Sequence, residues 1–182
     1  MNLANKLTLS RIFLIPVFML VLLTRIPYPF GEYIAAFIFI IAASTDGLDG
    51  YVARKRKQIT NFGKLLDPLA DKLLISAALI CLVELNQISA WVAFIIIGRE
   101  FFVTGLRSIM ASEGIVIAAS KLGKIKTITQ IVAISALLLN GFLQKLINIP
   151  LGKYLLYVAL FFTIWSGVDY YLKAKRNERL KL

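Results

Sequence analysis

The chain has 182 residues, of which 59% are hydrophobic and only 17% charged, and its formal charge is +11. This apolar content exceeds that of ordinary soluble domains, so the composition predicts an integral membrane protein. The sequence contains no histidine and one cysteine, which excludes Ser-His-Asp and Cys-His catalysis, intrachain disulfides and histidine or cysteine zinc sites. Catalysis would therefore use carboxylates, lysine, arginine, or a metal held by oxygen ligands.

Apolar segments separated by short polar turns predict an all-α fold, a polytopic membrane protein with six transmembrane helices. Residues 1–11 are polar with spaced leucines, and we expect a short N-terminal interfacial helix there. The spans are expected near 12–24, 33–49, 67–84, 90–110, 127–146 and 151–172. They are joined by turns at 25–32 and 84–89, a basic loop at 54–64, a glycine-containing loop at 111–126 and the NIPLG turn. Residues 173–182 are expected to form a basic tail, and the absence of repeats favours a single domain over 1–182.

Basic residues are distributed unevenly between the two faces of this predicted bundle. With six spans, only Arg25, Lys145 and Lys153 of the 21 Lys and Arg residues fall on the face opposite the termini. The positive-inside rule then places both termini on the cytoplasmic side of a bacterial cytoplasmic membrane. The high charge is therefore explained by membrane topology, and we expect contact with membrane lipids and no binding of nucleic acid.

The most polar stretch between apolar segments is DGLDGYVARKRKQITNFGKLLDPLAD, from Asp46 to Asp71. It contains four aspartates, and each carboxylate at bilayer depth costs about 2.5 to 3.5 kcal/mol on insertion scales. Such a cluster is expected at the membrane surface, around a bound cation, or both.

The spacing of these aspartates predicts a shared pocket. Asp46 and Asp49 are three residues apart near the end of one predicted helix, and Asp67 and Asp71 are four apart at the start of the next. Each pair therefore lies on one helical face. Four converging carboxylates would repel one another without a counter-charge, so we expect a hard divalent cation, Mg²⁺ or Mn²⁺.

Other residues of the same stretch favour phosphate chemistry. Gly50 and Gly63 allow close approach to the backbone, and the guanidinium of Arg54 is suited to a phosphate group. Cations, phosphate and guanidinium together indicate phosphoryl transfer, in which a carboxylate deprotonates the nucleophile.

The pattern Asp46-x2-Asp49-Gly50-x2-Ala53-Arg54-x8-Gly63-x3-Asp67-x3-Asp71 resembles, at every fixed position, the signature of the CDP-alcohol phosphotransferase family. The resemblance implies displacement of CMP from a CDP-linked lipid by an alcohol, a six-helix membrane fold and a homodimer. It also implies two divalent cations held by Asp46, Asp49, Asp67 and Asp71, with Asp71 as the catalytic base. The implied CDP-binding residues are Asp49, Gly50, Ala53, Arg54 and Gly63.

The signature leaves the acceptor alcohol open, and the remaining basic residues favour one that carries a phosphate. Arg11, Arg107, Lys124 and Lys126 lie where predicted span ends meet the cytoplasmic face, and we assign the acceptor phosphate to them. The segments NKLTLSRIFLIPVF, DPLADKLL, GREFFVTGLR and KLGKIKT also resemble the bacterial branch of this family that uses CDP-diacylglycerol and glycerol 3-phosphate as substrates.

Other interpretations remain open at this stage. Phosphatidylglycerol, giving cardiolipin, or inositol phosphate could be the acceptor instead. A small cation transporter would use the acidic cluster as an ion site, although such a site needs neither Gly50 nor Arg54 and more often lies at mid-membrane. Arg99 and Glu100 are either one intramembrane pair or substrate contacts, and Lys121, Lys124 and Lys126 could be topological flanks alone.

Overall fold

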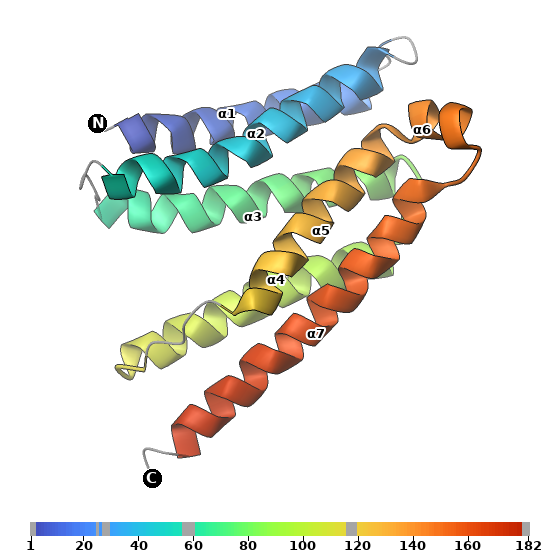
Figure 1. Cartoon of the computed structure of the whole chain (residues 1–182). Helices are drawn as coiled ribbons and strands as arrows, with labels where there is room; N and C mark the ends of the chain where they lie inside the picture. Colours follow the sequence, from blue (N-terminus) through green and yellow to red (C-terminus); the bar gives the residue numbers. More distant parts are fainter. Residues whose placement is uncertain (1–2, 25, 27–29, 56–60, 116–119, 180–182) are drawn as a thin grey trace.

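Long apolar runs of the sequence fold into helices. The computed structural model describes residues 3–24, 26, 30–55, 61–115 and 120–179, and these contain seven helices and no strand (Figure 1). Side chains are described for this part except at 3–7, 46–55, 61–68 and 177–179. The helices are α1 (Leu3–Leu23), α2 (Phe30–Lys55), α3 (Asn61–Glu84), α4 (Ala90–Ser112), α5 (Lys121–Leu138), α6 (Asn140–Ile147) and α7 (Leu151–Arg179). The all-α prediction is confirmed.

Several helices are longer than predicted. The expected interfacial helix and first span form one continuous helix, α1, which contains Pro16. Helices α2 and α3 extend toward each other, so that only 56–60 separate them and the predicted loop at 54–64 was too long. Helix α5 begins at Lys121 and α7 continues to Arg179, so the predicted loop and tail were partly wrong. These ends are rich in lysine, arginine, leucine and alanine, which are strong helix formers.

The fifth predicted span is interrupted. It was expected to be continuous over 127–146, but α5 ends at Leu138 and α6 continues at an angle of 80°. The Asn140-Gly141 dipeptide follows directly, and this pair favours a turn over a continuing helix. After α6 the chain turns again at Asn148, whose left-handed φ of 56° caps that helix and matches the predicted NIPLG turn.

The helices pack in two groups that share one core. Helices α1, α2 and α3 lie together, while α5 and α7 lie together with α4 beside them (Figure 1). The main core includes Phe18 of α1 and Phe39 of α2, whose ring centroids are 6.0 Å apart. Buried alanines on α2 and α3, such as Ala36 and Ala78, allow the helix backbones to approach closely. Cys81 is fully buried in this core.

The outside of the helices is strongly apolar. Large side chains such as Phe13, Trp91 and Leu146 are each at least 70% exposed, which is typical of a surface that faces lipid rather than water. Among the described residues, one helix segment, Leu151–Arg176, is long and apolar enough to cross a membrane, and the bent α5 and α6 pair would be a second if it forms one span. The six-span prediction is not confirmed by this criterion, partly because α4 carries Arg99, Glu100 and Arg107.

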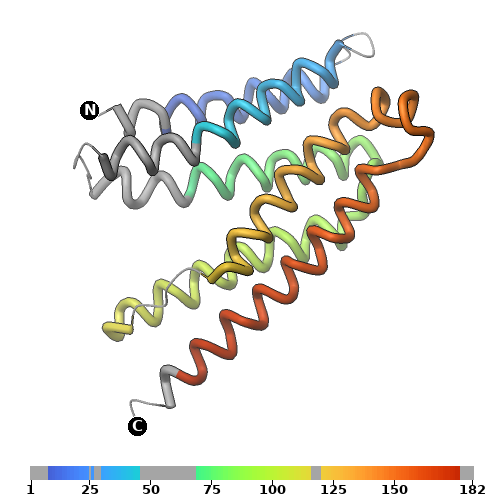
Figure 2. Tube along the Cα trace, in the orientation of Figure 1, coloured from blue at the N-terminus to red at the C-terminus, as the bar shows by residue number. Residues whose placement is uncertain are grey.

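The path of the chain gathers several helix ends on one side. The end of α4, the start of α5 and the later turns of α7 lie toward the same side of the molecule, as the sequence-coloured tube shows (Figure 2). The α3 to α4 turn and α6 lie toward the opposite side. This arrangement places distant polar segments near one another.

The contact between α5 and α7 depends on a glycine. A Cβ atom added at Gly152 would lie 3.0 Å from both the Cα and the backbone nitrogen of Leu137. We expect Gly152→Ala to lower the free energy of unfolding by about 1 to 3 kcal/mol, because backbone cannot move aside as a flexible side chain can. Thermal unfolding of the purified protein in detergent measures this change. Gly105→Ala in α4 is the matched control, since an added Cβ there has no neighbour within 4 Å; equal losses in both variants would contradict the packing argument.

Candidate active site

A polar cavity with a volume of about 640 Å³ lies between α3, α4, α5 and α7. Five basic and two acidic side chains line it together with small hydroxyl and apolar residues. The lining residues are Asp71, Lys72, Arg99, Glu100, Val103, Thr104, Arg107, Ser120, Gly123, Lys124, Lys126, Thr127, Ile128 and Tyr170. The excess of positive charge suits an anionic ligand.

Four of the residues predicted from sequence meet in this cavity. Asp71 comes from α3, Arg107 from α4, and Lys124 and Lys126 from the first turns of α5. Residues far apart in sequence therefore share one site, as expected if span ends converge. Arg11 is almost completely buried in α1 and does not line the cavity, so its part in the acceptor site stays a prediction.

The other predicted site residues have side chains outside the described part of the chain. Helix α2 runs through the positions of Asp46, Asp49, Gly50, Ala53 and Arg54, and α3 through those of Gly63 and Asp67. Neither aspartate pair stands at a helix end, because both helices extend further than predicted. Helix α2 packs against α3, and the helical spacing that unites each pair is preserved.

The chemistry of the predicted donors fits hard divalent cations. They are carboxylates carried by two adjacent helices, and the one described donor, Asp71, lies at the polar cavity. The chain has no histidine, and its cysteine is buried in the apolar core, so oxygen ligands dominate and Mg²⁺ or Mn²⁺ is the fitting class. Among the described side chains, no three His, Cys, Asp or Glu residues come together.

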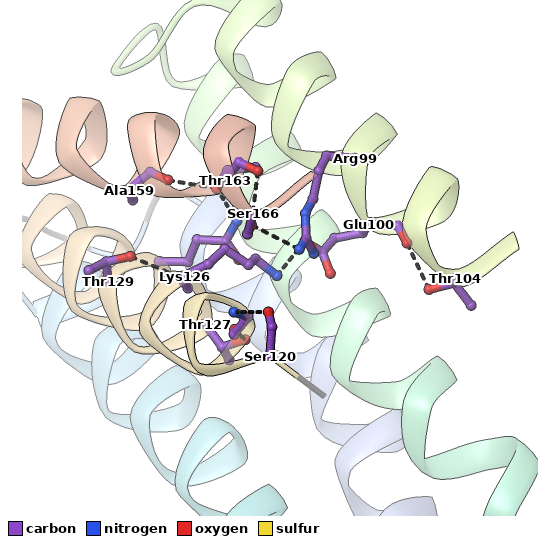
Figure 3. Close-up of polar contacts among 12 residues, drawn as sticks. Arg99, Glu100, Thr104, Ser120, Lys126, Thr127, Thr129, Ala159, Thr163 and Ser166 are labelled. Atoms are coloured by element: carbon purple, nitrogen blue, oxygen red, sulfur yellow. Dashed lines mark hydrogen bonds and ion pairs between the residues drawn. The ribbon is translucent and has the colours of Figure 1, made fainter. Parts of the chain in front are cut away.

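A carboxylate shared by two cations occupies the inner wall of the cavity. One oxygen of Glu100, Oε1, is 3.2 Å from Nη1 of Arg99 and also pairs with Nζ of Lys126 (Figure 3). All three side chains are nearly buried. The sequence left open whether Arg99 and Glu100 form an ion pair or contact the substrate. In the structure they form an ion pair and also line the candidate site.

Helix α7 holds the guanidinium of Arg99 from the other side. Nη2 of Arg99 donates a hydrogen bond of 2.9 Å to Oγ of Ser166, which in turn donates to the carbonyl oxygen of Thr163 (Figure 3). The guanidinium carbon also lies 5.8 Å from the centre of the Tyr170 ring, within the range of a cation–π interaction. Arg99 is thus fixed by three different groups.

The start of α5 is fixed at the same place. Ser120 is its N-cap, because its hydroxyl oxygen accepts a hydrogen bond of 3.1 Å from the backbone nitrogen of Gly123. The backbone nitrogen of Ser120 donates to the hydroxyl of Tyr170 at 3.0 Å. This cap sets the position of Lys124 and Lys126 relative to α4 and α7.

Arg107 and Lys124 differ from the inner cations. Both side chains are exposed at the cavity, and neither makes a hydrogen bond or ion pair with a side chain that the structure describes. Their charge is available to a ligand.

Sequence reasoning missed several lining residues, among them Ser120, Thr104 and Tyr170. Ser120 had a usable signal, since a serine directly before a helical segment is a frequent N-cap. Tyr170 had none, because its role depends on how α7 packs against α4 and α5. Asp169, one residue earlier, pairs with Lys173 at 2.7 Å and does not line the cavity.

Comparison with known proteins gives a consistent family. The sequence model of the CDP-alcohol phosphatidyltransferase family matches residues 1–165. A relative from Bacillus subtilis (strain 168) is 50% identical over 182 residues, covering 94% of each chain. One from Haemophilus influenzae is 42% identical and covers 96% of this chain and 94% of its own, and one from Rickettsia bellii is 39% identical and covers 96% of both. All three are named CDP-diacylglycerol--glycerol-3-phosphate 3-phosphatidyltransferase. With the family model matched over most of the chain, the protein belongs to the CDP-alcohol phosphatidyltransferase family.

Proposed function

We propose that this protein transfers the phosphatidyl group of CDP-diacylglycerol to glycerol 3-phosphate, producing phosphatidylglycerophosphate and CMP for phospholipid biosynthesis. The observation that carries the proposal is the cavity in which Asp71 of the family signature lies together with Arg107, Lys124 and Lys126. A carboxylate beside an excess of cations suits an acceptor that has both a hydroxyl to deprotonate and a phosphate to bind.

The names of the relatives support this acceptor over the alternatives. Three relatives that are 39% to 50% identical over nearly the whole chain carry a name that specifies glycerol 3-phosphate. Phosphatidylglycerol and inositol phosphate are therefore disfavoured as acceptors. Membership of a transferase family argues against a cation transporter.

In the proposed reaction, the carboxylate of Asp71 removes the proton from the C1 hydroxyl of glycerol 3-phosphate. The resulting oxygen attacks the phosphorus that carries the diacylglycerol group. As this new P–O bond forms, the bond between that phosphorus and the oxygen bridging to CMP breaks, and CMP leaves with the electron pair. Arg107 and Lys124, the exposed basic residues of the described part of the cavity, hold the acceptor's phosphate away from this centre, which orients the hydroxyl toward Asp71.

Two divalent cations complete the proposed site. Asp46, Asp49, Asp67 and Asp71 would hold them, and Asp49, Gly50, Ala53, Arg54 and Gly63 would contact the CDP group. When bound, such cations neutralise the diphosphate and the departing CMP. Arg54 would add a fixed guanidinium to the same phosphates.

The proposal includes a membrane setting. The exposed apolar helix surfaces and the uneven distribution of basic residues support a multi-pass protein of the bacterial cytoplasmic membrane with six passes. Both termini and the active site would face the cytoplasm. A homodimer completes the proposal.

The direct test is release of CMP from CDP-diacylglycerol by the purified full chain. We expect release with glycerol 3-phosphate and little with phosphatidylglycerol or inositol phosphate, because only the first combines a phosphate monoester with a primary hydroxyl. Release should require Mg²⁺ or Mn²⁺ and stop when a chelator is added. Activity with a different acceptor, or activity in the absence of divalent cations, would overturn the corresponding part of the proposal.

The role of Asp71 is tested by Asp71→Asn. This change keeps the size of the side chain but removes the base, so we expect turnover to fall by about 10² to 10⁴. Binding of CDP-diacylglycerol, measured by equilibrium titration, should be largely retained. A variant that turns over at the rate of the unchanged protein would refute the assignment of Asp71 as base.

The roles of Arg107 and Lys124 are tested by Arg107→Ala and Lys124→Ala. Each change removes a charge that lines the cavity without a carboxylate partner among the described side chains, so we expect the KM for glycerol 3-phosphate to rise about tenfold or more. The KM for CDP-diacylglycerol should change much less. Steady-state kinetics with each substrate varied in turn gives both values, and equal increases in the two would indicate a structural role instead.

A further inference from the structure

The basic side chains of the cavity fall into two sets, one paired with a carboxylate and one without such a partner among the described side chains. At the inner wall, Arg99 and Lys126 share the carboxylate of Glu100. Toward the end of α4, Arg107 has no such carboxylate among the described side chains, and the same is true of Lys124 on α5. Arg107 lies seven residues beyond Glu100 on α4, which is about 10 Å along a helix. An anionic group of a ligand could therefore bind at two different places in the cavity, one where the cations are already neutralised and one where they are not.

The inner set, Arg99, Glu100 and Lys126, is held in place by burial and by contacts with α7. Glu100 is 9% exposed and Lys126 is 4% exposed, so both side chains are largely enclosed by the protein. Arg99 is held on its far side by Ser166 and by the ring of Tyr170, and its Cγ lies 3.2 Å from the position a Cβ at Gly167 would occupy. The carboxylate between the two cations is the one anion in this set, and its removal would leave two buried positive charges without a partner.

Glu100 also determines where Lys126 can act. Asp71, the proposed base, lines the same cavity as Lys126 and Glu100, and its charge also acts on the ammonium group of Lys126. Because Glu100 already pairs with this ammonium group, an incoming phosphate gains less at the inner wall than at Arg107 and Lys124. The inner end is thus left for the uncharged, hydroxyl-bearing part of the acceptor.

We propose that Glu100 is a positioning residue that sets the direction in which the acceptor binds. It neutralises Arg99 and Lys126, so that the phosphate of the acceptor binds at Arg107 and Lys124 and its hydroxyl points inward to Asp71. In this respect the inference departs from the sequence-based prediction, which also assigned the phosphate to Lys126. This inference rests on the proposed function for the identity of the acceptor. It assigns Glu100 no contact with the reacting atoms.

The inference predicts a gain of binding when the carboxylate is removed. In Glu100→Gln the side chain keeps its size, but Arg99 and Lys126 become a second anion site at the inner wall. We expect the full chain in a nonionic detergent to bind inorganic phosphate about tenfold more tightly than the unchanged protein, given the effective dielectric of such partly buried sites. Calorimetric titration with inorganic phosphate, in buffer without divalent cations, measures this directly.

Three variants separate charge compensation from damage to the fold. Glu100→Asp restores the carboxylate and should bind phosphate like the unchanged protein. Glu100→Gln combined with Lys126→Met removes one of the released cations and should lose most of the gain. Asp169→Asn is the matched control, because it removes a carboxylate paired with a lysine on α7 outside the cavity, and it should leave phosphate binding unchanged.

Kinetics supply a second readout that a purely structural role would not move. Inward binding of the acceptor's phosphate is unproductive, so Glu100→Gln should lower kcat and the KM for glycerol 3-phosphate by similar factors while kcat/KM changes little. Unfolding would instead lower kcat/KM and leave phosphate binding weak. A folded Glu100→Gln protein that binds phosphate no more tightly than the unchanged protein overturns the inference. Because phosphate binding needs no turnover, this result is independent of whether glycerol 3-phosphate is the acceptor.

Discussion

The shared carboxylate of Glu100 is the interaction on which the arrangement of α4, α5 and α7 around the cavity depends. Two cations from α4 and α5 meet at one of its oxygens, and α7 supports the guanidinium of Arg99 through Ser166 and Tyr170. Removing one member of a buried ion pair is strongly destabilising, whereas the intact pair contributes little net stability. The main role of this ion-pair network is therefore to fix the positions of α4, α5 and α7 relative to one another. It thereby also positions the basic residues of the site.

The location of these charged side chains at the cavity explains how a largely apolar helix bundle accommodates them. Arg99 and Glu100 lower the hydropathy of α4 and so count against its being a membrane span. Both side chains face the cavity and each other instead of the outer surface. The outer surface of the same helix carries exposed Trp91, Phe94 and Phe101. Intramembrane charges that face an internal cavity are typical of functional sites in membrane proteins. Hydropathy alone therefore understates how well such a helix suits a membrane.

Much of the fold and part of the candidate site could be predicted from the sequence, and the limits follow from the type of interaction. The turns near 84–89 and 148–150 were predicted correctly because asparagine, proline and serine act locally. The break after Leu138 was missed although Asn140-Gly141 signalled it, since the apolar pattern on both sides favoured one continuous span. The helical ends at Lys121 and Arg179 were missed because charge was taken to indicate a loop, while lysine and arginine are strong helix formers.

The sequence by itself determined the chemistry of this protein. The spacing of four aspartates, the absence of histidine and the glycine and arginine positions between Asp49 and Asp67 predicted the family, which the family model confirms. They could do so because the predicted metal and phosphate ligands lie within one helical pair, where local spacing alone sets which residues share a face. Only the tertiary structure decided which basic residues share a cavity with Asp71 and which of them are already neutralised. That distinction depends on contacts between α4, α5 and α7 across gaps of 26 to 67 residues, such as those of Glu100 with Lys126 and of Arg99 with Ser166, and no local pattern encodes them.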